Sequence, residues 1–229
     1  MRSRWIGMLG ALFVALSVFA STSAAASSER AVVELWKALK PLTTVTSVMN
    51  TGAHPDDERS HLLAYFSLGV GARTISVIAN RGEGGQNELG NEYVHALGVL
   101  RSQELAHAAE VLNMRLAILS QDLDDPIWDF GFSKSPEETL ALWGEEYALE
   151  RLIRAIRTHR PDVLYPSFDN VPSQHGHHRA INLLTVEAFS KAADPTVFPE
   201  HFEEGLHPWQ PRKLYLPVGA EEGTVQVPV

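Results

Sequence analysis

The sequence of 229 residues contains no cysteine. A chain without cysteine can form neither a disulfide framework nor a cysteine-linked lipid anchor, so its folded state depends on core packing alone. Positive charge is also scarce, because 28 acidic residues outnumber 19 lysines and arginines. A strongly acidic domain without a basic stripe is a poor partner for nucleic acid, and we expect none to bind.

A glycine-rich dinucleotide-binding turn is missing as well. The first predicted strand, at 44–52, leads into "AHPDDE" at 53–58 and not into a G-x-G-x-x-G turn. We therefore set aside a nucleotide-binding domain of Rossmann type.

The apolar run at 5–20 is shorter than the roughly 20 residues that a membrane-spanning helix needs. It follows a basic start, "MRSR", and precedes "STSAAASS", which is the layout of a secretory signal peptide with cleavage before Ser27. An uncleaved membrane anchor is the alternative interpretation. We expect residues 1–26 to be removed and the product to be secreted, periplasmic or attached to the cell envelope, without a stable membrane span.

The remaining residues, 27–229, predict one α/β domain in which strands and helices alternate. Predicted strands lie at 44–52, 73–80, 115–120, 162–167 and 212–218. Predicted helices lie at 29–40, 57–71, 91–113, 135–161 and 177–194. This alternation predicts a Rossmann-like three-layer α/β/α fold around a mostly parallel sheet. The last residues, "GTVQVPV", resemble the start of another strand. They are either an exposed edge strand or the end of the N-terminal part of a longer chain, and we favour the second interpretation slightly.

Two clusters of metal-ligand residue types follow predicted strands. His54 and Asp57 lie three residues apart after the first strand, and His175 and His178 have the same spacing after the fourth. In an open parallel sheet, ligands bind at the carboxyl ends of the strands. A catalytic zinc ion takes three histidine or carboxylate ligands and keeps a fourth position open for water. We therefore predict a site for zinc, or another divalent metal, formed by His54, Asp57 and His178.

The groups left over in these clusters supply acid–base chemistry. Asp56 and His175 would lie within reach of the open metal position, where hydrolysis needs one group to accept a proton and one to donate it. A structural interpretation also exists, because an aspartate pair after a strand often caps a helix. We expect His177 to face away from the site. The other histidines are expected at the surface or in helix packing: His61, His95, His107, His159, His201 and His207.

These two motifs resemble the signatures of the PIG-L/LmbE zinc deacetylases. The likeness rests on "AHPDDE" at 53–58 and "HGHHRA" at 175–180, although the family usually has His-Pro-Asp-His at 175–178. "RGEGGQN", "LRSQEL" and "GLHPWQPRKLY" resemble further family segments, so the likeness runs from about residue 44 to 217. The family removes the acetyl group from N-acetylglucosamine in precursors of glycolipids and thiol cofactors.

The resemblance implies a role for each predicted site residue. It makes Asp56 the general base, while His175 stabilises the oxyanion or protonates the leaving amine; the implied zinc ligands are His54, Asp57 and His178. Arg101 matches an arginine that contacts the sugar, and Asp129 in "IWDFGF" matches a substrate-contacting aspartate more loosely. Some members place a tyrosine where this chain has Ser173.

The expected activity is zinc-dependent removal of an N-acetyl group from a small molecule or glycan that contains N-acetylglucosamine. An exported enzyme would meet a glycan of the envelope or the surroundings. Two alternatives remain open. In the first, the chain is an amidase of the same fold that acts on another amide, such as a thiol conjugate. In the second, it is a carbohydrate-binding module within a larger surface protein.

Cleavage of the signal peptide is directly testable. We expect mass spectrometry of the exported protein to show a mature N-terminus at Ser27, because small residues at Ala24 and Ala26 fit the signal peptidase. Ala26→Leu places a large side chain at the cleavage position and should slow processing. Recovery of the wild-type protein in the membrane fraction with residues 1–26 still attached would contradict this prediction.

Overall fold

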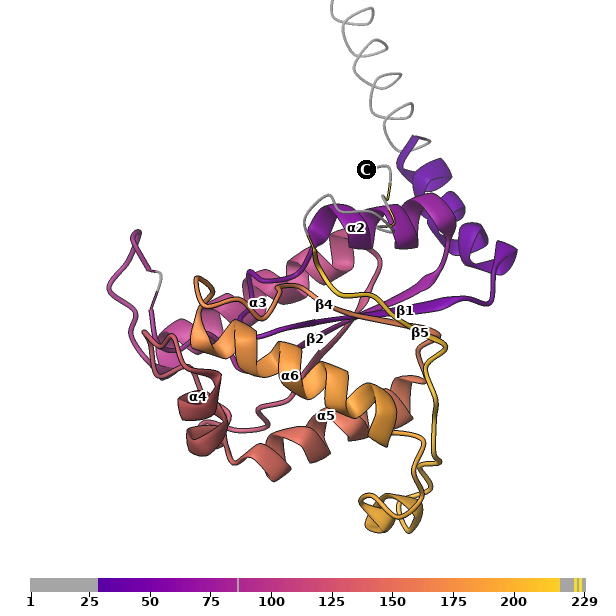
Figure 1. Cartoon of the computed structure of the whole chain (residues 1–229). Helices are drawn as coiled ribbons and strands as arrows, with labels where there is room; N and C mark the ends of the chain where they lie inside the picture. Colours follow the sequence, from indigo (N-terminus) through magenta and orange to yellow (C-terminus); the bar gives the residue numbers. More distant parts are fainter. Residues whose placement is uncertain (1–28, 86, 219–224, 226, 228–229) are drawn as a thin grey trace, which may run out of the picture. The chain divides into compact units, whose positions relative to one another are not determined.

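The computed structural model describes residues 29–85, 87–218, 225 and 227 (Figure 1). The predicted signal peptide and most of "GTVQVPV" lie outside the described residues, so both interpretations stay predictions. The chain divides into two compact units, 1–43 and 44–229. The described part of the first unit is a helix at 29–39 followed by a 3₁₀ turn at Lys40–Thr43.

Five strands form one sheet in the second unit, and every neighbouring pair is parallel. Their order is β3-β2-β1-β4-β5. The strands are β1 (Ser47–Gly52), β2 (Arg73–Ile78), β3 (Arg115–Ile118), β4 (Val163–Pro166) and β5 (Lys213–Leu214). This arrangement confirms the predicted fold class. The central strand β1 has β2 on one side and β4 on the other, which makes its carboxyl end the switch point where open α/β sheets bind ligands.

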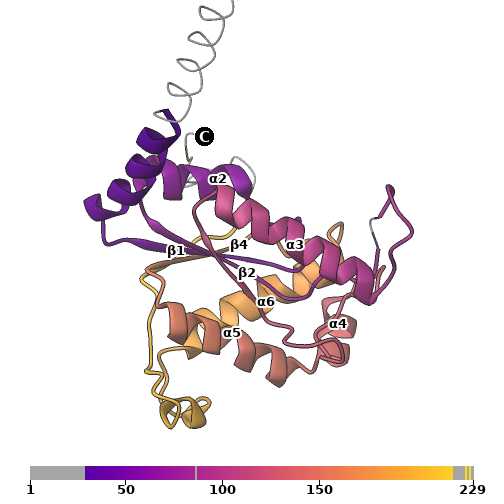
Figure 2. The ribbon, with the colours of Figure 1, turned by 180° about the vertical axis from the view of Figure 1, so that it is seen from behind.

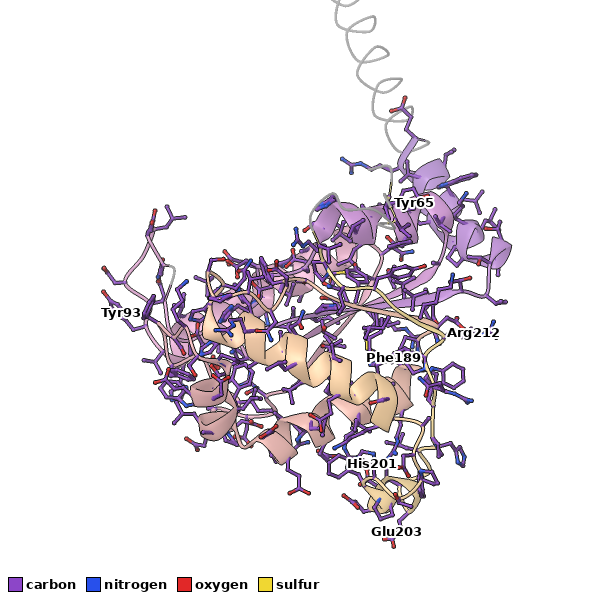
Figure 3. The ribbon with its side chains drawn as sticks, viewed as in Figure 1. Tyr65, Tyr93, Phe189, His201, Glu203 and Arg212 are labelled. Carbon is purple, nitrogen blue, oxygen red and sulfur yellow. The ribbon has the colours of Figure 1, made fainter. Side chains whose placement is uncertain are left out.

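Helices cover both faces of the sheet (Figures 1 and 2). One face carries α2 (Ser60–Ala64) and α3 (His95–Val111), and the other carries α5 (Glu145–His159) and α6 (Gly176–Lys191). A shorter helix, α4 (Pro136–Trp143), packs beside α5 and α6. In Figure 3, Tyr93, on the loop before α3, lies toward one end of the strands, and Arg212, just before β5, lies toward the other. Within the described part of the chain, no helix is both long and apolar enough to cross a bilayer.

Two predicted helices differ from the observed ones at identifiable residues. The helix predicted at 135–161 is broken at Gly144, whose φ of 74° ends α4 and begins α5. The helix predicted from residue 91 begins only at His95, because Val94 has a φ of 50°, which a helix does not allow, and the Asn87 side chain donates to the carbonyl of Glu92 in the preceding loop. The helix predicted at 57–71 consists of α2 and a π-helical stretch, Tyr65–Val70.

The core follows from the alternation of side chains along the strands. Met49 of β1 belongs to the large apolar cluster under α5 and α6, while the preceding residue, Val48, faces a smaller cluster on the opposite side. Ile78, Leu63 and Leu105 join β2 to α2 and α3 in a further cluster. Burial on both faces rigidly holds the strands whose ends carry the polar motifs.

A buried arginine fixes the loop that follows α6. Arg157, only 2% exposed, donates hydrogen bonds to the backbone carbonyls of Ala192, Asp194, Val197 and Phe198. It also contacts Nδ1 of His201 at 3.0 Å.

His201 completes this network, because its Nε2 lies 2.6 Å from Glu150 of α5. Figure 3 labels it on the loop below α6. His201 is fully buried. One guanidinium thus ties the backbone of this loop to α5 through four hydrogen bonds.

Substitution of Arg157 should destabilise the fold strongly. Arg157→Met removes four hydrogen bonds to backbone carbonyls and the contact with Nδ1 of His201, and we expect the free energy of unfolding to fall by about 3–5 kcal/mol in urea titrations. Arg154→Met is the matched control on the same helix, because Arg154 pairs with the half-exposed Glu204. That variant should lose about 1 kcal/mol or less. Equal losses for the two variants would refute a special role for Arg157.

Candidate metal centre and active site

The first motif forms a tight turn around the carboxylate of Asp57. Its Oδ2 accepts the backbone N–H groups of Ala53 and His54, both at 2.8 Å. Gly52 permits this approach, because a Cβ there would lie 2.9 Å from both Asp57 Cβ and Ile78 Cδ1. The turn brings Nδ1 of His54 to 3.3 Å from Oδ2 of Asp57.

The second motif meets this turn because β4 pairs with β1. The loop after β4 leads into α6, and His178 lies in the first turn of that helix. Its Nε2 is 3.2 Å from Oδ1 of Asp57 and 3.2 Å from Nδ1 of His54. The three predicted ligands, far apart in sequence, therefore converge.

The spacing of these three donor atoms fits a small divalent cation. A tetrahedral zinc ion with bonds of 2.0–2.1 Å separates its ligand atoms by about 3.3 Å. The two imidazole nitrogens, His54 Nδ1 and His178 Nε2, lie 3.2 Å apart, and each lies close to one oxygen of Asp57: Oδ2 at 3.3 Å from His54 and Oδ1 at 3.2 Å from His178. The donor set, two imidazole nitrogens and one carboxylate, is also one that zinc uses in catalytic sites. That a metal binds here stays a prediction.

The electrostatics of the site favour a positive charge. Burial opposes ionisation of Asp57, but hydrogen bonds from His178 and His54 outweigh it and hold the pKa of this carboxyl well below its usual range. Burial likewise opposes a charge on His54, yet the hydrogen bond to Asp57 and the charges of Asp57, Asp129 and Asp56 raise its pKa. Both shifts show that the turn attracts a cation.

Asp56 is not one of the three converging donors and remains accessible. Its side chain is 60% exposed, and its Oδ1 accepts a hydrogen bond of 2.6 Å from Arg101. Arg101 itself is buried and also donates to the carbonyls of Gly82 and Gly85. A side chain at Gly82 would collide with this guanidinium. The glycine-rich loop thus holds Arg101 against Asp56, and whether Arg101 also contacts a sugar stays a prediction.

His175 stands at the N-terminal boundary of α6 beside the loop at 131–133. Its Nε2 lies 2.9 Å from the carbonyl of Gly131 and 3.2 Å from the backbone N–H of Ser133. The loop therefore offers this nitrogen both an acceptor and a donor, so either neutral tautomer finds a partner. Burial, with the neighbouring His54 and His178, lowers the pKa of His175. Its ring can exchange a proton without losing its position.

The expectation that His177 faces away from the site is wrong. The residue is fully buried, and its Nδ1 lies 2.9 Å from Nε2 of His54. Burial and the neighbouring histidines lower the pKa of His177 to about 2, so the ring is neutral. Spacing alone could not place it, but its position in the motif, where the family usually has an aspartate, was an available signal.

Asp129 is buried between the histidines and the glycine-rich loop. Its carboxylate lies 3.5 Å from Nδ1 of His177 and 3.9 Å from Nε2 of His54. Its backbone N–H donates to Glu83, a buried carboxylate that sequence reasoning did not single out. A substrate contact by Asp129 stays a prediction.

An aromatic ring that sequence reasoning also missed supports His178. Phe168 stacks on the imidazole with ring centroids 4.1 Å apart and planes 10° apart. The guanidinium of Arg59 lies over the Phe168 ring and donates to the carbonyl of Ser167. Ser173, at the position of the family tyrosine, is exposed and accepts a hydrogen bond from Lys134 through its carbonyl.

Residues 49–189, more than half of the chain, match the PIG-L family model, described as GlcNAc-PI de-N-acetylase. The chain belongs to the PIG-L family. It is 30% identical over 192 residues to mycothiol S-conjugate amidase of Streptomyces coelicolor, covering 78% of this chain and 62% of the relative. It is 31% identical over 179 residues to 1D-myo-inositol 2-acetamido-2-deoxy-alpha-D-glucopyranoside deacetylase 1 of Frankia alni, covering 71% and 59%. The PIG-L chain thus spans about six-tenths of the length of these relatives.

Solved structures agree with this family at the level of the fold. N,N'-diacetylchitobiose deacetylase from Pyrococcus horikoshii superposes with a TM-score of 0.55 at 21% identity, covering 75% of this chain and 59% of that one. GalB, a 4-carboxy-2-hydroxymuconate hydratase from Pseudomonas putida, gives 0.51 at 18% identity, covering 66% and 58%. Since a hydratase shares the architecture, the fold alone does not decide the reaction.

Two histidines of the second motif can be distinguished by metal content. We expect His178→Ala to lose the metal, because it removes one of the three converging donors. His175→Ala, three residues away, should retain about one ion per chain. Elemental analysis after dialysis against buffered zinc measures both. If His175→Ala loses the metal and His178→Ala retains it, the ion is bound by other donors than His54, Asp57 and His178.

Proposed function

We propose that this PIG-L protein is a metal-dependent hydrolase that removes the N-acetyl group from an N-acetylglucosamine-containing substrate. The observation that carries the proposal is the convergence of His54, Asp57 and His178 beside an accessible carboxylate, Asp56. A relative at 31% identity is named as a deacetylase of an acetamido sugar, which supports this substrate class.

The three donors would hold a zinc ion as a Lewis acid. Such an ion polarises a bound carbonyl and lowers the pKa of a bound water towards about 7. Asp56, on the same turn as His54 and Asp57, is an exposed carboxylate able to accept a proton.

Asp56 acts as the general base in this proposal. The ion pair with Arg101 engages Oδ1, fixes the carboxylate plane and leaves the group 60% exposed to water. Asp56 takes a proton from the attacking water, and the new C–O bond forms as the carbonyl π bond opens. The negative charge collects on the former carbonyl oxygen.

His175 completes the proton balance. When Nε2 accepts from the Ser133 N–H, Nδ1 carries the proton and can donate to the developing oxyanion. When Nε2 donates to the Gly131 carbonyl, the ring is ready to take up or pass on a proton at Nδ1. The proton removed from water then reaches the departing amine, directly from Asp56 or through His175, as the C–N bond breaks and acetate is released.

A second candidate function is hydrolysis of another amide, such as a thiol conjugate. The relative named as a mycothiol S-conjugate amidase is about as similar as the named deacetylase. Both reactions would use the same ligands and the same base. Acetate release from acetylated amino sugars, measured beside amine release from thiol-conjugate amides, separates the two.

The signal-like N-terminus motivates the final part of the proposal. An exported enzyme would act on a glycan outside the cytoplasm, in the periplasm, the envelope or the medium. A carbohydrate-binding module without catalysis is the remaining rival. Bound metal without hydrolysis of any amide would favour that rival.

Asp56→Asn tests the assignment of the base. The amide cannot accept the water's proton, so we expect acetate release to fall by about 10²–10⁴-fold while metal content stays near wild type. Asp169→Asn is a matched control, because Asp169 also follows a strand at this edge but belongs to no proposed role. The control should keep its activity.

The same assay is run on the wild-type protein after its metal has been removed with a chelator. Removal of the metal should abolish acetate release, and addition of zinc should restore it. A fully active Asp56→Asn variant would show that another group accepts the proton.

A further inference from the structure

His54 can serve as a ligand through Nδ1 only in one protonation state. Nδ1 faces Asp57 and His178, so this nitrogen must be free of a proton to bind a cation. The neutral ring then carries its proton on Nε2. A buried N–H of this kind needs an acceptor, because an unpaired one destabilises the folded state.

The nearest acceptor is an imidazole. Nε2 of His54 lies 2.9 Å from Nδ1 of His177, which is a hydrogen-bond distance. The carboxylate of Asp129 is farther from Nε2, at 3.9 Å. The edge of His54 that faces away from Asp57 and His178 is therefore held by a second histidine.

We propose that His177 is a positioning residue for metal binding, which accepts the Nε2–H of His54 through its own Nδ1. This hydrogen bond fixes the His54 tautomer that leaves Nδ1 free, and it sets the angle of the ring towards Asp57 and His178. Partners of this kind orient metal-bound histidines in many sites, and their loss weakens metal binding by about 10–100-fold.

The surroundings of His177 suit this role. The ring packs between Phe130 and Trp143, with centroids 4.3 and 5.2 Å away. It is fully buried, so water does not compete for its Nδ1. Its Nε2 has no hydrogen-bond partner among the described residues, which is a cost that a purely space-filling apolar residue would avoid. The polar ring is explained by the bond that its other nitrogen makes.

A second metal ion is the rival explanation for the same histidines. His54, His175 and His177 also offer donor atoms near one another. However, 2.9 Å between His54 Nε2 and His177 Nδ1 is shorter than the separation of about 3.3 Å between ligands of a tetrahedral zinc ion. The hydrogen bond accounts for the contact without a second ion.

An isosteric pair of variants isolates this hydrogen bond. In His177→Asn the amide oxygen would take the place of Nδ1, whereas in His177→Leu the side chain has the same branched shape without an acceptor. Both variants lose the same ring. We expect His177→Leu to bind zinc about 10–100-fold more weakly than His177→Asn in competition with a chelator. Equal affinities would overturn the proposal, because His177 would then only fill space.

Two measurements keep the test independent of folding and of substrate. Thermal unfolding of the metal-free variants measures how much the buried amide or leucine alone changes stability, and zinc affinities are compared at a temperature where both variants are folded. In the zinc-loaded wild-type protein, ¹⁵N spectra of the histidines should show the proton on Nε2 of His54 and none on Nδ1 of His177. A proton on Nδ1 of His177, or two ions bound per wild-type chain, would overturn the proposal.

These readouts concern metal binding alone. A protein that binds zinc as expected but releases no acetate would refute the proposed deacetylation and leave the role of His177 standing. If the wild-type protein releases acetate but His177→Leu and His177→Asn bind zinc equally well, the proposed deacetylation stands and the role of His177 is refuted.

Discussion

The carboxylate of Asp57 is the group on which the site depends. One of its oxygens accepts two backbone N–H groups and thereby folds the turn after β1. Its other oxygen faces His178 from the distant motif. A single buried charge therefore sets the local backbone, orients His54 and joins two halves of the sheet. Such a charge is tolerated only because hydrogen bonds and histidines surround it, and a bound cation would satisfy it further.

The sheet supplies the second requirement, which is that the two motifs meet. β4 lies directly beside β1 although 110 or more residues separate paired positions such as Val48 and Val163. The chain reaches β4 only after it has built β2 and β3 on the other side of β1. Open α/β sheets bind ligands at such a reversal of direction, outside the carboxyl ends of the strands. The general rule for open sheets thus explains why the chemistry gathers here and not at another strand end.

Local signals in the sequence were enough for the architecture and for the convergence of the ligands. The strands are short runs of β-branched and apolar residues, and parallel strands must end at a common edge, so His54 and His178 could be expected at one place. Contacts between side chains could not be foreseen in the same way. The break at Gly144, the ion pair between Asp56 and Arg101, and the burial of His177 each depend on how loops pack against one another. No periodicity in the sequence encodes that packing.

The family usually has proline at position 176 and aspartate at 177, where this chain has glycine and histidine. The contacts of these two positions explain the difference. The N–H of Gly176 donates to the carbonyl of Ser133, and a Cβ at this position would collide with Ser133, so a proline would lose the bond and crowd the loop. An aspartate at 177 would place a charged oxygen near the present Nδ1, which lies 3.5 Å from Asp129. Two buried carboxylates at that distance repel each other strongly. A neutral imidazole accepts the same hydrogen bond without the added charge, and so the histidine can occupy this position beside Asp129.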